Sequence, residues 1–167
     1  MGMAQSAVIK ISVSLAGTAE RPEGESGPEV MRGFSELMDR GVDLRFCGLD
    51  PDWLATGSYL VDRGEFKTLD EMRDGLRAMK RLRDTLEARP HAGSVRVMTF
   101  RHNPTYHAIV VDPDEQDLGH MLVTPHLHGV KQSDAPVMQL SHRSNPELFE
   151  TLWTSIQQLT DQGQRVW

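Results

Sequence analysis

Cysteine is almost absent from this chain. Its 167 residues include one cysteine, Cys47, and a single cysteine excludes a disulfide framework within the chain. We therefore expect a reducing, cytoplasmic setting. Cys47 lies in the apolar run from Leu44 to Leu49, which predicts a buried small side chain rather than a reactive thiol.

Long apolar runs and excess positive charge are absent as well. No run approaches the roughly 18 apolar residues of a membrane span, and the first residues lack the apolar region of a signal peptide. The net charge of −6 opposes non-specific binding of DNA or RNA. The length and the hydrophobic fraction of 38% predict one globular domain over residues 1–167, with a core over about residues 8–160.

Several catalytic signatures are missing too. There is no glycine-rich dinucleotide fingerprint, no Walker-type phosphate loop and no Gly-x-Ser-x-Gly nucleophile turn. We therefore expect no cofactor.

Alternating apolar residues predict about six strands, at residues 8–14, 43–50, 95–100, 106–111, 121–124 and 137–140. Three capping-box patterns predict three helices, which begin near Ser26, Thr68 and Ser144. Gly41 is the expected end of the first helix, and residues 51–67 show no clear period. The basic residues of the second helix alternate with acids, which predicts a solvated face.

This order predicts an α/β fold, with a mixed β-sheet between helices. The first half is typical of parallel strands joined by right-handed crossovers, and the second half of hairpins. Ligands in such sheets bind beyond the carboxyl ends of the strands. That rule directs attention to polar residues at predicted strand ends, namely Ser12, Ser14, Asp50, Asp52 and the region of Asp112.

Three segments resemble one repeat of the phospholipase-D-like superfamily, in particular small bacterial domains of regulatory and signalling proteins. They are GVDLRFCGLDPD (Gly41 to Asp52), PTYHAIVVDPD (Pro104 to Asp114) and SNPELFETLW (Ser144 to Trp153). The resemblance covers roughly residues 8–155. It implies the phospholipase-D-like half-fold and a homodimer.

Active members carry a His-x-Lys-x₄-Asp motif, whose histidine attacks phosphorus and whose lysine binds the phosphate. The resemblance assigns these catalytic places to His107 and Asp114, but Ile109 stands at the lysine position. Losing such an electrostatic contact costs roughly 10²–10³ in rate. The Gly-Ser-x-Asn that usually follows is missing as well. The degenerate motif favours a domain that binds a phosphorylated or nucleotide-like ligand without cleaving it.

All seven histidines lie in the second half of the chain. His126 and His128 are one residue apart, which on a strand would place both rings on one face. This spacing suits a metal such as zinc, with His107 or His120 as a third ligand. Because no further metal signature supports it, we expect no metal, and we interpret His126 and His128 as the rim of a ligand pocket.

Four hypotheses remain open. The first is a non-catalytic sensor of a phosphorylated ligand, or a dimerisation module. The second is a homodimeric phosphodiesterase or nuclease that uses His107. The third is a metal enzyme built on His126 and His128. The fourth is an interaction module with a protein partner through Trp53, Trp153 and Trp167, although core packing suits two of these positions better.

Overall fold

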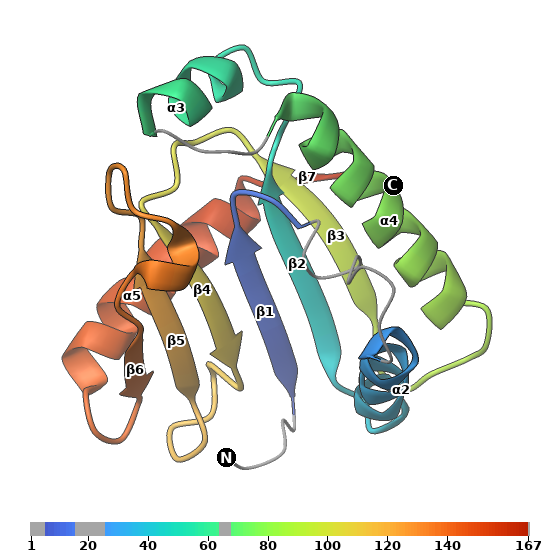
Figure 1. Ribbon diagram of the computed structural model, residues 1–167. Helices are drawn as coiled ribbons and strands as arrows, with labels where there is room; N and C mark the ends of the chain where they lie inside the picture. Colours follow the sequence, from blue (N-terminus) through green and yellow to red (C-terminus); the bar gives the residue numbers. More distant parts are fainter. Residues whose placement is uncertain (1–5, 16–25, 64–67, 167) are drawn as a thin grey trace.

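Seven strands form one mixed sheet in the part of the chain that the computed structural model describes, residues 6–15, 26–63 and 68–166 (Figure 1). Their order across the sheet is β6-β5-β4-β1-β2-β3-β7. The strands are β1 (Ala7–Ser12), β2 (Asp43–Leu49), β3 (Val95–Phe100), β4 (Tyr106–Val111), β5 (His120–Pro125), β6 (Met138–Ser141) and β7 (Gln164–Arg165). β1, β2 and β3 are parallel, while β4, β5, β6 and β7 pair antiparallel with their neighbours. The predicted mixed α/β sheet is confirmed.

Helices lie on both sides of this sheet (Figure 1). α2 (Ser26–Asp39) and α4 (Leu69–Leu86) pack over β2 and β3, and we name that side the α4 face. α5 (Pro146–Asp161) crosses the opposite side, the α5 face. α3 (Thr56–Arg63) follows β2, and a short 3₁₀ helix, η1 (Gln132–Asp134), lies between β5 and β6. No described helix has the length and apolar character needed to cross a bilayer.

Strand alternation divides the interior into two cores. Ile9, Ile11 and Val110 point to the α5 face, where they join Phe149 and Ile156 of α5. On the α4 face, Leu44, Phe46, Val95 and Val97 pack against Met38, Met79, Leu82 and Leu86. Cys47 is buried on the α5 face as predicted, and burial raises the pKa of its thiol to about 12.

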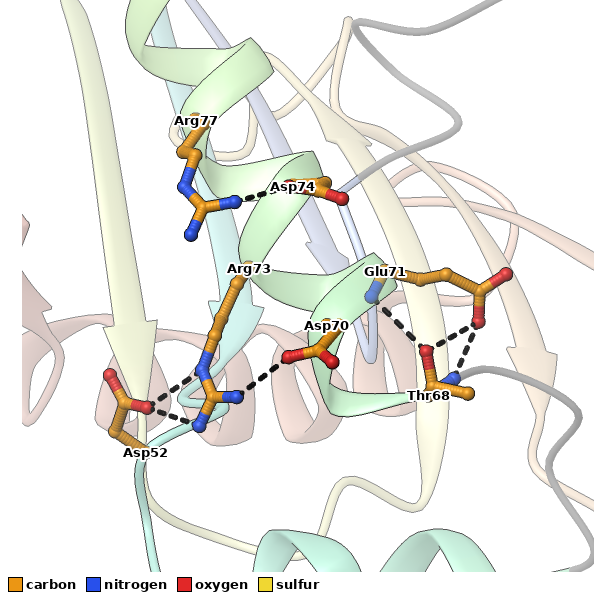
Figure 2. A network of polar contacts seen from close by, with 7 residues as sticks. All are labelled: Asp52, Thr68, Asp70, Glu71, Arg73, Asp74 and Arg77. Carbon is orange, nitrogen blue, oxygen red and sulfur yellow. Dashed lines mark hydrogen bonds and ion pairs between the residues drawn. The ribbon is translucent and has the colours of Figure 1, made fainter.

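Local sequence signals explain where the long helices begin and end. The hydroxyl of Thr68 accepts from the backbone N–H of Glu71, and the carboxylate of Glu71 accepts from the N–H of Thr68, so the capping box of α4 is confirmed (Figure 2). Gly41 follows α2 with a φ of +88°, the left-handed conformation expected after a helix.

The alternating charges predict a solvated face of α4, and several basic side chains on it pair with acids. Arg73 contacts both Asp70 and Asp52, and Arg77 contacts Asp74 (Figure 2). Because these groups are largely solvated, each pair adds little to the stability of the fold. The contact with Asp52 also ties α4 to the turn that follows β2.

Parts of the element prediction were wrong. The described residues contain four α-helices and seven strands, because α3 and the two-residue β7 gave no periodic signal. The predicted capping box at Ser144 does not form: Asn145 precedes α5 and makes no capping bond through its side chain. Trp153 is buried in the core and Trp53 packs against it, whereas Trp167 and the side chain of Ser26 lie outside the described residues.

Candidate functional site

The candidate site lies on the part of the α4 face formed by β1, β4 and β5. α2 and α4 pack over β2 and β3, while β4 and β5 carry the long helix α5 on their other side (Figure 1). Burial reflects this difference. Ala108 and Val110 on the α5 face are fully buried, whereas His107 and Ile109 on the α4 face are half-buried.

Lys10 is brought to His107 by the pairing of β1 with β4. Lys10 and Ile109 are direct partners in this antiparallel pair, so both side chains stand side by side on the α4 face. His107 is two residues from Ile109 on the same strand and shares that face. Lys10 therefore neighbours the position at which the motif lysine is missing, and its charge acts on His107.

His107 is held in its neutral form. Burial, together with smaller contributions from the charges of Lys10 and His126, lowers its pKa to about 4. Its Nδ1 is buried and finds no hydrogen-bond partner among the described residues. Thr124 pairs with His107 across β4 and β5 and is buried. A neutral imidazole beside a lysine can receive an anion, or attack an electrophile through its free lone pair.

His126 extends the site beyond the end of β5. Its Nδ1 lies 3.1 Å from the carbonyl oxygen of Pro104 and 3.3 Å from the Tyr59 hydroxyl, which itself donates to the Pro104 carbonyl at 2.7 Å. Because a carbonyl only accepts, Nδ1 of His126 carries the proton and donates it. This arrangement fixes the ring and leaves Nε2 as the acceptor of the neutral form.

The expectation that His126 and His128 share one face of a strand was wrong. β5 ends at Pro125, so both histidines lie in the connection to β6, and His128 is exposed. Within the described ranges, no three side chains of the His, Cys, Asp and Glu types gather closely enough to hold a metal ion. The geometry that the metal hypothesis requires is not formed there.

Two of the predicted ligand-binding residues follow parallel strands. Ser14 comes after β1, and Asp50 comes directly after β2, where its carboxylate is mostly buried and accepts from Arg101 Nε at 2.9 Å. Asp52 follows and pairs with Arg73. Asp50 and His107 lie at the same end of the strands. Because β1 stands between them, they do not form a single cluster.

Asp112 and Asp114 lie at the opposite end of the strands. β4 runs antiparallel to β1, so its carboxyl end meets the beginning of β1, and the expectation that Asp112 joins the ligand edge was wrong. Its carboxylate instead accepts from the N–H groups of Ser6 and Ala7 at 2.7 and 3.1 Å. Asp114 is exposed in the turn beyond, and the strand from His107 to Val111 alone spans roughly 13 Å.

Lys10 and Tyr59 are the site residues that the sequence did not reveal. Lys10 occupies a polar position of a predicted strand, but strand order and register, which decide its neighbour, leave no local signal. Tyr59 belongs to α3, for which no period was visible.

No model of a known protein family matches the chain, and no curated protein matches it either. The resemblance to phospholipase-D-like domains therefore rests on the sequence segments given above and stays a prediction.

Proposed function

We propose that this chain is a non-catalytic, phospholipase-D-like regulatory module that binds a phosphorylated small molecule or nucleotide beside His107. The observation that carries the proposal is the position of Lys10. It stands next to Ile109, on the same sheet face as His107, and offers a cation where the motif lysine is absent.

A phosphate is the ligand that this chemistry suits best. An ammonium donates short, charge-assisted hydrogen bonds to phosphate oxygens, and hydrogen bonds to charged groups contribute about 1.5–3 kcal/mol each. The setting is partly desolvated, as the lowered pKa of His107 indicates, so screening by water is weaker there. His126 adds a second imidazole close enough to His107 for the two groups to interact electrostatically.

Binding without cleavage is favoured by what the motif lacks. Ile109 cannot hold the phosphoryl oxygens, and Asp114 lies at the far end of β4 from His107. The Gly-Ser-x-Asn segment of active relatives is replaced by Val123 to His126. Together these departures remove the fixed groups that would stabilise charge as it develops on phosphorus.

The test is a titration of the protein with inorganic phosphate and with adenosine monophosphate, followed by calorimetry and by amide NMR shifts. We expect the largest shifts along β1 and β4, and a loss of affinity of about tenfold or more in Lys10→Met and His107→Asn. Lys80→Met is the matched control, since it removes the same charge from the exposed face of α4, where Lys80 pairs with Asp84. Equal weakening by Lys80→Met, or no binding at all, would overturn the proposal.

The alternative is a homodimeric phosphodiesterase, and the neutral state of His107 favours it, because a nucleophile needs a free lone pair. Hydrolysis of bis(4-nitrophenyl) phosphate separates the two functions. The sensor hypothesis predicts no turnover that depends on His107. Turnover that disappears in His107→Asn and persists in Lys80→Met would establish the phosphodiesterase.

Dimerisation is a further part of this proposal. β6 is one edge strand of the sheet. Val137 before it and Met138 at its start are 61% and 42% exposed, which suits a contact between two copies. Sedimentation equilibrium should give a dimer that Val137→Glu dissociates. A monomer at all concentrations would restrict the module to a site within one chain.

A further inference from the structure

A hollow lies on the α5 face, between the connection from β3 to β4 and the carboxyl-terminal half of α5. It encloses about 300 Å³. It is separate from the site at His107, because Tyr106 lines it and successive side chains of a strand point to opposite faces.

The lining of this hollow is mostly polar. Seven of its nine residues end in hydroxyl, amide or imidazole groups, and none is Asp, Glu, Lys or Arg. Two contacts organise these groups: the Tyr106 and Ser155 hydroxyls are 2.9 Å apart, and His102 Nε2 lies 2.7 Å from the side-chain oxygen of Gln162. The remaining surface includes Leu159 and the ring of Tyr106, which offer apolar contact.

This chemistry selects a class of ligand. A phosphate or carboxylate would find no fixed countercharge, and a purely apolar molecule would bury the amides of Asn103 and Gln158 without replacing their bonds to water. Hydroxyl and amide groups both donate and accept, which matches a ligand whose own groups do the same. The volume is at the lower end for small-molecule sites.

One wall of the hollow is also held in place. Pro104 is buried, and its carbonyl accepts from the Tyr59 hydroxyl and from His126 on the other side of the loop. A site formed before its ligand arrives loses less conformational entropy on binding.

We propose that this hollow is a binding site for a neutral, polyhydroxylated ligand of the size of one sugar ring. Tyr106 and Leu159 contact the carbon–hydrogen face of the ring, while Asn103, Ser155 and Gln158 bond its hydroxyl groups. The proposal is independent of phosphate binding at His107.

The test is amide NMR of the ¹⁵N-labelled chain with glucose, galactose and ribose, and with adenosine and inorganic phosphate as comparisons. We expect sugar-dependent shifts confined to residues 102–106 and 155–162, with a Kd near 1 mM, as is common for a site with few contacts. Asn103→Ala and Gln158→Ala should each weaken binding at least fivefold. Gln157→Ala, an exposed neighbour on the same helix that does not line the hollow, should leave it unchanged.

Three outcomes would overturn the proposal. The first is no sugar-dependent shift at about 50 mM, which is far above that Kd. The second is a set of shifts that Gln157→Ala weakens as much as Gln158→Ala does. The third is a response to phosphate or adenosine in residues 155–162, away from β4, that exceeds the response to every sugar. Asn103→Ala and Gln158→Ala change exposed side chains, so both variants should keep the fold. Their amide spectra check this.

Discussion

At the scale of single residues, His107 makes the stability of the protein depend on pH. Its native pKa of about 4 lies below its ordinary value of 6.5. Between pH 6.5 and pH 4 this histidine is protonated in the unfolded chain but neutral in the native state. It therefore lowers the stability of the fold as the pH falls through this range. The full shift corresponds to about 3 kcal/mol, which partial exposure to water reduces to about 2.

His107→Asn should remove this dependence. The difference in unfolding free energy between the wild type and the variant should change by about 2 kcal/mol from pH 7 to pH 4, in favour of the variant at low pH. Urea denaturation at four pH values measures it. A difference that is constant over this range would mean that the native imidazole titrates as it does in the unfolded chain.

At the scale of elements, two glycines of the first helix region should respond in opposite ways to the same substitution. Gly41 holds a φ of +88°, so Gly41→Ala should destabilise the protein by about 1 kcal/mol. Gly33 lies inside α2, and a Cβ there would meet no atom within 4 Å, so Gly33→Ala should stabilise by about 0.5–1 kcal/mol. Chemical denaturation of both variants tests the pair, and equal signs would contradict it.

Elements were predictable from the sequence wherever a local pattern sets them. The strand at residues 95–100 and the helix after Thr68 were found because alternation and capping are local. α3 was missed because its eight residues carry no clear apolar stripe, and β7 because two residues cannot show a period. The site was found in part: His107 carries a motif, whereas Lys10 becomes its neighbour only through strand order.

At the scale of the whole molecule, one sheet joins the two cores, and we expect them to unfold together. Phe149 of the α5 face and Met79 of the α4 face are both fully buried. Phe149→Ala should cost about 3–5 kcal/mol and Met79→Ala about 2–5 kcal/mol. Each variant should still unfold in one transition, because neither helix layer can lose its packing without exposing the shared strands.

Thermal unfolding followed by near-ultraviolet and far-ultraviolet circular dichroism checks this expectation. Leu148→Ala is the control, since that neighbouring side chain is 46% exposed and its loss should change stability by about 0.5 kcal/mol or less. Two separate transitions in either core variant would mean that the faces are independent units.

The position of β1 has a consequence for synthesis on the ribosome. β1 is made before the other strands of the described sheet, yet it lies between β2 and β4 in the middle of that sheet. Its partner β4 emerges roughly a hundred residues later, which at 5–20 residues per second takes roughly 5–20 s. During that interval the nascent chain can assemble β1, β2 and β3, but the side of β1 that will receive β4 remains an open edge. A chaperone that protects the growing chain would have to shield that edge.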